Sequence, residues 1–192
     1  MAIAIEITEQ PLAALAEHAR IDSAFEVRTV LDVASPAGGF GGLVLTERPV
    51  DAPYIRDFDD DRSGAATWAD YFDVSRWGLI AAHLDGQRVG GAVIAFDTPG
   101  VRMLEGRTDL AVLWDLRVAA EARGQGVGSA LFRAVEAWAM ARECRWLKIE
   151  TSTVNVPACR FYARQGCLLG AIHRLAYPEV PEEAMLLWYK QL

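Results

Sequence analysis

A glycine-rich turn between a buried strand and an amphipathic helix is the feature that most constrains the fold of this chain. Residues 110–118 (LAVLWDLRV) form a nearly continuous apolar run, which is typical of a central strand buried on both faces. In residues 125–142, apolar side chains recur at helical spacing, which predicts an amphipathic helix. The turn between them contains three glycines at alternate positions, Gly124, Gly126 and Gly128.

This turn has the features of an anion-binding site. The first turn of a helix carries unpaired amide N–H groups and a partial positive charge. Because glycine lacks a Cβ atom, an anion such as pyrophosphate can approach those amides closely, and Ser129 adds a hydroxyl. The alternative is a plain tight turn into a helix. A P-loop requires a lysine after the last glycine, and a dinucleotide fold requires the spacing G-x-G-x-x-G, so both fit poorly.

The remaining segments predict a single α/β (α+β) domain, residues 1–192, with a mixed sheet. Two strand patterns, 77–84 and 89–96, flank Asp85-Gly86, a dipeptide typical of a type I′ hairpin turn. Alternating or apolar runs predict further strands at residues 1–7, 25–33, 43–48, 146–152, 168–173 and 183–189. Short helices are expected at residues 11–20, 66–71 and 156–165, and an irregular connection at 51–66.

The net charge of −7 and the pI of about 5.0 argue against a nucleic-acid partner, which requires a basic surface. They are compatible with a cationic small-molecule partner, or with an acidic surface that serves solubility alone. No apolar run is long enough for a membrane span, and the first residues do not resemble a signal peptide. We therefore expect a cytoplasmic protein with reduced thiols at Cys144, Cys159 and Cys167, without a membrane partner; a homodimer stays open.

The string Arg123-Gly124-Gln125-Gly126-Val127-Gly128 resembles the R/Q-x-x-G-x-G/A signature of the Gcn5-related N-acetyltransferase (GNAT) family. The resemblance covers about residues 75–192 and implies acetyl-CoA as co-substrate, with its pyrophosphate on the loop amides and its pantetheine arm on the preceding strand. It implies that the parallel strands at 110–118 and 146–152 splay apart to form the acetyl slot. The cofactor-binding residues that it implies are Leu116, Arg117, Val118, Arg123, Gly124, Gln125, Gly126, Val127, Gly128, Ser129 and Asn155.

Longer strings resemble the streptothricin acetyltransferases within that family. They are YIRDFDDD (54–61), HLDGQRVGGAVIAFDTPGV (83–101), MLEGRTDLAVLWDLRV (103–118) and NVPACRFYARQGC (155–167). The resemblance implies acetylation of an amine on the β-lysine moiety of that antibiotic. Two other functions stay open: an N-acetyltransferase that acts on a protein or peptide, and a non-catalytic acetyl-CoA-binding module.

Acetyl transfer to an amine requires a base and an acid. A lysine-like amine with a pKa of about 10.4 is neutral in only about one part in 2,500 at pH 7. A base, or a water path to one, is therefore expected near the slot, and the departing thiolate requires a proton. The resemblance implies that Tyr162, in its F-Y-x-x-x-G string, is the acid beside the thioester sulfur. The alternative is that Tyr162 packs against the sheet with Phe161.

Two carboxylates within apolar strands are candidates for the base. Glu150 stands twelve positions before Tyr162, an interval that some protein-acetylating members of the family share. Because an unpaired buried charge is costly, the alternative for Glu150 is an ion pair with Lys148. Asp115 is the second candidate: it either steers or deprotonates the cationic amine, or it pairs with Arg117.

Several further residues have a functional and a structural interpretation. Asn155 precedes a predicted helix, so it is a candidate N-cap as well as a pantetheine ligand. Substrate contacts are also predicted for an acidic stretch whose alternative is a solvated loop: Asp57, Asp59, Asp60 and Asp61. Weaker candidates for substrate walls are Trp77, Tyr71 and Asp73. The three histidines lack ligand spacing, so no metal is expected. A Cys–His hydrolase with Cys159 and His173 is conceivable, but nothing in the sequence marks Cys159 as activated.

Overall fold

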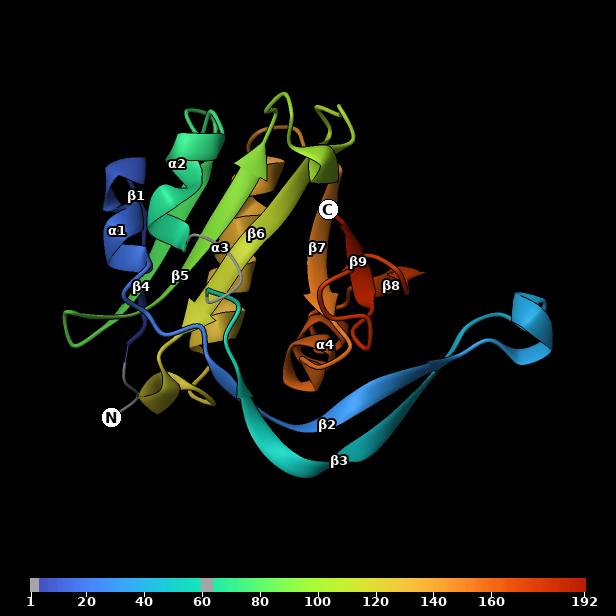
Figure 1. The fold of residues 1–192 in the computed structure, drawn as a ribbon. Helices are drawn as coiled ribbons and strands as arrows, with labels where there is room; N and C mark the ends of the chain where they lie inside the picture. Colours follow the sequence, from blue (N-terminus) through green and yellow to red (C-terminus); the bar gives the residue numbers. More distant parts are fainter. Residues whose placement is uncertain (1–3, 60–63) are drawn as a thin grey trace. The chain divides into compact units, whose positions relative to one another are not determined.

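The backbone of the protein, in a computed structural model that describes residues 4–59 and 64–192, divides into two compact units (Figure 1). The first unit consists of Met1–Ser23, Asp57–Lys148 and Gln191–Leu192. The second consists of Ala24–Arg56 and Ile149–Lys190. The candidate anion-binding loop belongs to the first unit, and the candidate acid and base belong to the second.

The first unit is built on an antiparallel meander of four strands. In spatial order these are β1 (Glu6–Gln10), β4 (Gly78–Leu84), β5 (Gln87–Phe96) and β6 (Leu110–Val118). The turn between β4 and β5 has positive φ at both Asp85 (48°) and Gly86 (77°), which confirms the predicted type I′ hairpin. Strand β6 has the predicted bounds, and its first four residues are buried.

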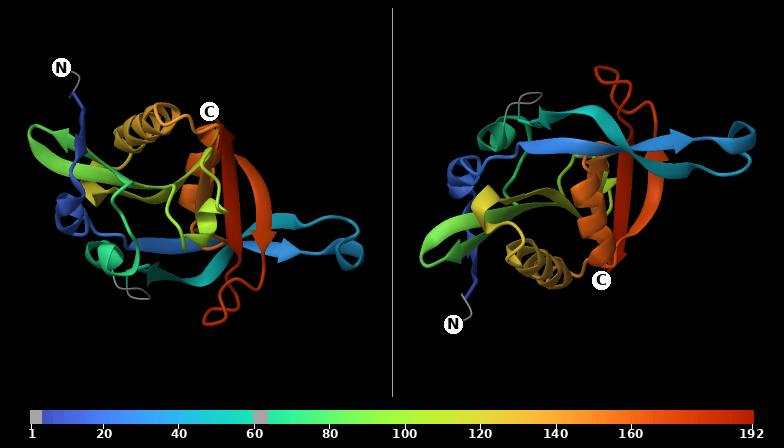
Figure 2. Two further views of the ribbon diagram at one scale, coloured as in Figure 1. Left: turned by 90° about the horizontal axis from the view of Figure 1, so that it is seen from above. Right: turned by 90° about the horizontal axis from the view of Figure 1, so that it is seen from below.

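Helices cover both faces of this meander (Figure 2). The long helix α3 (Val127–Met140) lies on one face, and the short helices α1 (Leu15–His18) and α2 (Trp68–Tyr71) lie on the other. Two adjacent glycines of β5 allow the helices to approach closely. A Cβ atom on Gly90 would lie 3.0 Å from Leu131 of α3, and one on Gly91 would lie 2.4 Å from Nδ1 of His18 in α1.

The second unit contains a two-stranded antiparallel ribbon, β2 (Phe25–Ala34) and β3 (Val44–Arg56). Its small apolar core consists of Val27, Val30 and Val154, with Phe25 and Val50 packed against it. The unit also holds helix α4 (Val156–Arg164) and three strands. In spatial order the strands are β7 (Trp146–Ser152), β9 (Met185–Gln191) and β8 (Leu168–His173). Strand β7 begins in the first unit and ends in the second.

Short 3-10 segments complete the described secondary structure, at Leu12–Ala14, Pro36–Gly39, Ala65–Thr67, Arg102–Leu104 and Ala120–Ala122. The expected irregular connection at 51–66 is wrong at its start, because β3 continues to Arg56. The pairing register moves from Val27–Tyr54 to Thr29–Pro49, so residues 50–53 bulge out opposite Arg28. Bulges and edge strands accommodate proline, which explains why Pro49 and Pro53 do not end the strand.

Substitution of Gly91 by alanine tests the close approach of α1 to β5. Because the new methyl group would overlap the buried His18 ring, Gly91→Ala should lower the free energy of unfolding by about 1–3 kcal/mol. The matched control is Gly64→Ala, since a Cβ atom there lies 3.5 Å from Asp59 and φ is −56°. Urea denaturation of both variants is the measurement, and equal stability of the two would contradict the packing.

Candidate active site

The glycine loop of the first unit ends at Gly126, which caps helix α3. Gly124 and Gly126 have φ of 78° and 88°, a region that only glycine adopts readily. Among residues 4–59 and 64–192, a Cβ atom on Gly124 would meet no atom within 4 Å, and one on Gly126 would meet only Ile5 at 3.9 Å, so these residues leave space beside both glycines. The first-turn amides of Val127, Gly128 and Ser129 have no acceptor within the helix. The loop therefore has the geometry expected of an anion cradle.

Two side chains tie this loop to the chain before it. Arg123 Nε donates to the carbonyl of Val118 at 3.0 Å, and Gln125 Nε2 donates to the carbonyl of Glu121 at 2.8 Å. Both bonds span at most five residues, so the loop is held locally against the end of β6. Neither side chain needs an anion for its placement, and the backbone amides remain the groups suited to bind one.

Strand β6 pairs with β5 along the segment predicted to contact the cofactor arm. Leu116, Arg117 and Val118 lie opposite Ala92, Gly91 and Gly90. The register then shifts between the pairs Val93–Asp115 and Ile94–Leu113, so Trp114 is the extra residue of a β-bulge. Bulges re-aim side chains and backbone groups and are frequent beside active sites. The sequence contains no proline or glycine here that would have predicted it.

Asp115 is bound by two donors. Its Oδ2 atom lies 2.7 Å from His18 Nε2 and 2.6 Å from Arg117 Nε. His18 is fully buried, and its Nδ1 atom has no partner within the described part of the chain, so we assign the ring proton to Nε2. The ion pair between Asp115 and Arg117, which was one of the two alternatives from the sequence, is present. The link to His18 was not predicted.

Opposing effects set the pKa of Asp115. Burial raises it, but the hydrogen bond from His18 and the charge of Arg117 together outweigh burial and hold the pKa below its usual range. Arg117 also donates to both carboxylate oxygens of Asp59, at 2.6 and 2.8 Å, and to the carbonyl of Ile21 at 3.1 Å. These contacts outweigh burial and raise the pKa of Arg117. Both groups therefore stay charged over the physiological pH range.

Two carboxylates of the acidic stretch, those of Asp57 and Asp59, form hydrogen bonds within the protein. Asp57 Oδ1 accepts from Ser23 Oγ at 2.6 Å and from the amide of Asp59 at 2.9 Å, while Asp59 binds Arg117. Asp60 and Asp61 lie outside the described residues. The structure thus assigns Asp57 and Asp59 internal partners that their sequence pattern did not reveal.

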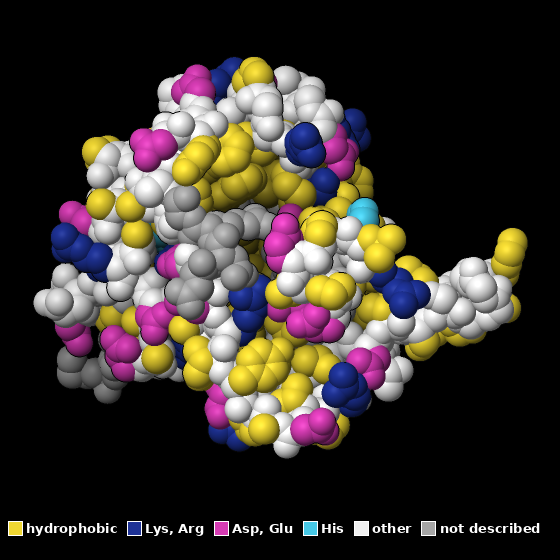
Figure 3. Space-filling view, viewed as in Figure 1, with side chains coloured by type: hydrophobic (Ala, Val, Ile, Leu, Met, Phe, Trp, Pro, Cys, Tyr) yellow, Lys and Arg dark blue, Asp and Glu magenta, His cyan; other side chains and the backbone are white. Residues whose placement is uncertain are grey.

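Trp77 is a core residue, which corrects its prediction as a substrate wall. Its side chain is 5% exposed, its ring stacks on Phe72, and its Nε1 donates to Thr98 Oγ1 at 2.9 Å. The half-buried rings of Trp68, Phe72 and Trp114 pack around it instead. Figure 3 shows hydrophobic side chains gathered in a hollow over β5 and β6 beside α2.

In the second unit, α4 begins at Asn155 and carries Tyr162. Asn155 Oδ1 accepts from the amide of Ala158 at 3.2 Å, which confirms the predicted N-cap. Tyr162 is 8% exposed, and its ring lies 5.3 Å from that of Phe161 in an edge-on contact. The packing interpretation of Tyr162 therefore holds, and it does not exclude a hydroxyl that acts as an acid.

Glu150 lies on β7 and is half-buried. Its Oε1 atom accepts a hydrogen bond from the hydroxyl of Tyr177 at 2.8 Å. Lys148, the partner considered from sequence, donates instead to Glu105 Oε1 at 2.6 Å and to the carbonyl of Met103 at 3.2 Å. No sequence pattern predicted Tyr177, because only the path of the chain after β8 brings it to Glu150.

The Cys–His hydrolase alternative loses support. Burial raises the pKa of the Cys159 thiol to about 12, so this cysteine is not an activated nucleophile. Within residues 4–59 and 64–192, no group of three or more His, Cys, Asp and Glu side chains is arranged to hold a metal ion.

In the same ranges, no helix is both long and apolar enough to cross a membrane.

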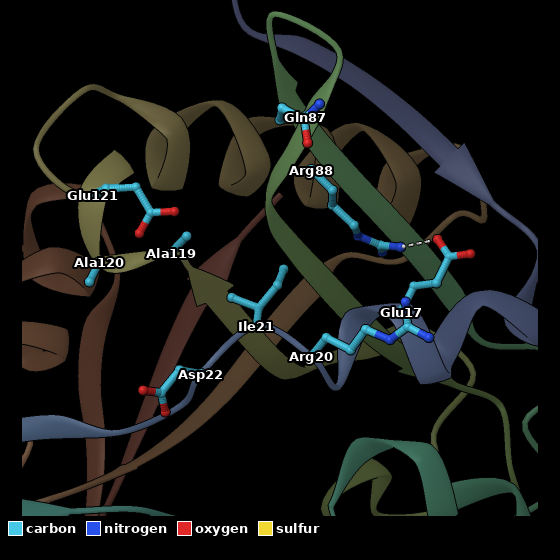
Figure 4. Close-up of a pocket in the computed structure, with 9 residues that line it drawn as sticks. All are labelled: Glu17, Arg20, Ile21, Asp22, Gln87, Arg88, Ala119, Ala120 and Glu121. Atoms are coloured by element: carbon cyan, nitrogen blue, oxygen red, sulfur yellow. Dashed lines mark hydrogen bonds and ion pairs between the residues drawn. The ribbon is translucent and has the colours of Figure 1, made fainter.

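A pocket of about 590 Å³ lies in the first unit beside the segment that leads into the glycine loop (Figure 4). Ala119, Ala120 and Glu121 form one wall, and the opposite wall contains Arg88 and Glu17 of α1. Arg88 donates to Glu17 at 3.3 Å, and burial lowers the pKa of Arg88 despite that partner. Charges of both signs line the pocket, so it has no clear preference for one ligand charge.

Comparisons with known proteins identify relatives along most of the chain. The model of the Acetyltransferase (GNAT) family matches residues 46–167. The streptothricin acetyltransferase of Escherichia coli is 30% identical over 178 residues, which cover 91% of this chain and 90% of that protein. The crystal structure of a nourseothricin acetyltransferase superposes with a TM-score of 0.75 at 25% identity, covering 98% of each chain.

A Bacillus anthracis protein crystallised in complex with acetyl coenzyme A has the same fold. It superposes with a TM-score of 0.75 at 22% identity and covers 100% of this chain and 99% of its own. Together these neighbours establish a mixed α/β fold with a central mixed sheet flanked by helices.

Replacement of Asp115 by asparagine tests the buried ion pair. Asp115→Asn leaves Arg117 with one carboxylate fewer and should lower the free energy of unfolding at pH 7 by about 3–5 kcal/mol. Because the folded-state pKa of Asp115 is lowered, its carboxylate stabilises the fold above its ordinary pKa of about 3.9. That contribution is lost as the pH falls below this value and through the folded-state pKa, and the variant should lack this loss.

The matched control is Asp32→Asn, which removes an ion pair with Arg48 whose partners are about half exposed. It should change the free energy of unfolding by less than about 1 kcal/mol. Chemical denaturation at pH 7 and pH 3 measures both variants. Equal losses at pH 7 would contradict the structural role of Asp115.

Proposed function

Because the chain belongs to the GNAT family of acetyltransferases, we propose that it transfers the acetyl group of acetyl-CoA to an amine on the β-lysine moiety of streptothricin. The observation that carries the donor half is the glycine loop, whose two positive-φ glycines open a space beside the first-turn amides of α3. The acceptor half rests on the streptothricin and nourseothricin acetyltransferases to which the chain is similar. The consequence for a cell would be resistance to the antibiotic.

The residues that would hold acetyl-CoA fit the group chemically. The amides of Val127, Gly128 and Ser129 offer N–H donors and the positive end of a helix to a pyrophosphate. Backbone groups of Leu116 and Val118 are the polar groups of β6 suited to a pantetheine amide, whereas the side chain of Arg117 is already committed to carboxylates. Asn155 caps α4 through its side chain, so only its remaining groups would contact the arm. The bound molecule supplies a thioester, which activates the acetyl group.

Glu150 is the base in this proposal. Its only hydrogen bond in the described residues comes from Tyr177 to Oε1, which leaves Oε2 able to accept a proton from the acceptor ammonium, directly or through a water. Asp115 is less suited, because His18 and Arg117 stabilise its ionised form and lower its pKa. Proton removal makes the amine nitrogen a nucleophile toward the acetyl carbonyl carbon.

Tyr162 is the acid. As the carbon–sulfur bond breaks, its hydroxyl donates a proton to the departing sulfur, so that free thiol leaves. Its buried position on α4 limits the access of water to that proton. The surplus proton on the amide nitrogen passes to the Tyr162 phenolate, directly or through water, and Glu150 gives the proton of the ammonium to solvent. One turnover therefore releases one proton and restores both side chains.

The acceptor is expected to be cationic. The chain carries a net charge of −7, which attracts cations to its surface. The half-buried rings of Trp68, Phe72 and Trp114, rather than the buried ring of Trp77, supply aromatic faces that attract a cation. Asp57 and Asp59 support this surface by holding residues 57–59 against Ser23 and Arg117.

Thiol release from acetyl-CoA tests the function with three acceptors. Streptothricin should accelerate release, whereas free lysine and an N-terminal peptide should do so far less. Release with the peptide alone would retain the enzyme class and reject the antibiotic as substrate. Tight binding of acetyl-CoA without release in any arm would favour the non-catalytic module.

Substitution of Tyr162 by phenylalanine removes only the proposed acid. Tyr162→Phe should lower kcat with streptothricin by about 100-fold, because a positioned acid contributes at least that factor to proton transfer. The KM for acetyl-CoA should stay within error of the wild type, since the ring and its contact with Phe161 remain. Undiminished turnover of this variant would reject Tyr162 as the acid.

Substitution of Gly126 tests the anion cradle. Gly126→Ala forces alanine into positive φ and narrows the space beside the first-turn amides, so the Kd for acetyl-CoA should rise by about tenfold. The control Gly42→Ala also places alanine at positive φ (78°) with no atom nearby, but in the second unit between β2 and β3. Isothermal titration calorimetry should find a changed Kd only for Gly126→Ala. A similar rise for both variants would point to general destabilisation.

A further inference from the structure

The hydrogen bond between Tyr177 and Glu150 joins the candidate base to a loop distant in sequence. Tyr177 lies 27 residues after Glu150, in the connection between β8 and β9, and is half-buried. Its hydroxyl donates to Oε1 of Glu150 at 2.8 Å. A carboxylate accepts stronger hydrogen bonds than a neutral oxygen does, so this contact orients the Glu150 side chain.

The loop that carries Tyr177 is fastened at its far end. The amide of Val180 donates to the carbonyl of Tyr177 at 3.2 Å, and the amide of Glu183 donates to the carbonyl of Val180 at 2.9 Å. Glu183 is 5% exposed and forms an ion pair with Arg56 at 2.9 Å. A buried ion pair with one dominant geometry restricts the loop more strongly than an exposed one.

The same loop is also joined to the strand of the base. Thr153, which directly follows β7, donates its amide to the carbonyl of Ala184 and accepts the amide of Ala184 on its hydroxyl, both at 3.0 Å. Glu150 lies three residues before Thr153. The loop therefore contacts the β7 segment at two points, the Thr153 pair and the Tyr177–Glu150 bond, and the position of Tyr177 is fixed relative to the carboxylate.

We propose that Tyr177 is a positioning residue for Glu150: its hydroxyl holds the carboxylate in one rotamer, with Oε2 left to accept the proton of the acceptor amine. This inference rests on the proposed role of Glu150. Tyr177 donates to one of the two carboxylate oxygens, and a phenol hydroxyl carries no charge, so the contact orients the base without forming an ion pair with it. The partners of Asp115 differ in this respect, since they include the full positive charge of Arg117.

A double-mutant cycle tests the inference, with thiol release in the presence of streptothricin as the assay. Tyr177→Phe should lower kcat by about tenfold, the loss typical of one hydrogen bond to a charged group, and leave the KM for acetyl-CoA unchanged. Glu150→Gln should lower kcat by about 100-fold. Because Tyr177 acts through Glu150, the double variant should be no slower than Glu150→Gln alone.

The cycle separates this role from a structural one. If Tyr177→Phe merely loosened the second unit, it would lower kcat by the same factor in the Glu150→Gln enzyme as in the wild type. Such equal factors would overturn the inference. The matched control is Tyr54→Phe, on β3 of the same unit with the tyrosine 41% exposed; it should keep wild-type kcat. A wild-type kcat for Tyr177→Phe would also overturn the inference.

Failure of the underlying proposal is recognised separately. A wild-type enzyme that releases no thiol with streptothricin rejects the proposed function. Wild-type turnover by Glu150→Gln rejects Glu150 as the base, and the role of Tyr177 with it. An active wild type, a slow Glu150→Gln and an unaffected Tyr177→Phe reject the role of Tyr177 alone.

Discussion

The first unit depends on the hydrogen bonds and ion pairs of the Arg117 guanidinium. It binds Asp115, Asp59 and the carbonyl of Ile21, and so joins β6 to the segment after α1 and to residues 57–59. A buried arginine without these partners would be strongly destabilising, because its charge would lose water without compensation. The next residue along β6, Val118, accepts the hydrogen bond of Arg123 that holds the glycine loop. The loop that forms the anion cradle is therefore held to the residue that follows Arg117.

Two carboxylates within apolar strands have different partners, and this difference separates their roles. Asp115 faces a buried histidine and an arginine, which keep it ionised and committed to the fold. Glu150 receives one hydrogen bond from a neutral phenol and keeps an oxygen available in the described structure. A base must be able to accept a proton near neutral pH, so an environment with one neutral donor suits catalysis better than one with a full positive charge. On this basis we propose Glu150 rather than Asp115 as the base.

Local patterns in the sequence predicted the elements that carry the site, whereas distant contacts were beyond them. The bounds of β6, the Asp85-Gly86 turn and the Asn155 cap follow from short-range rules. The His18–Asp115 and Asp59–Arg117 contacts join residues 97 and 58 positions apart, and no periodicity reports such pairs. The same limit explains why the sequence revealed neither the packing of Trp77 against Phe72 nor the contact of Tyr177 with Glu150.

The measurement that tests the account most directly is the identification of the product formed from streptothricin and acetyl-CoA. Mass spectrometry with fragmentation locates the added group, and NMR identifies the acylated nitrogen. The account predicts a singly acetylated antibiotic with an amide on an amine of the β-lysine chain, in an amount equal to the thiol released. Recovery of unmodified streptothricin alongside full acetylation of a peptide amine would contradict it.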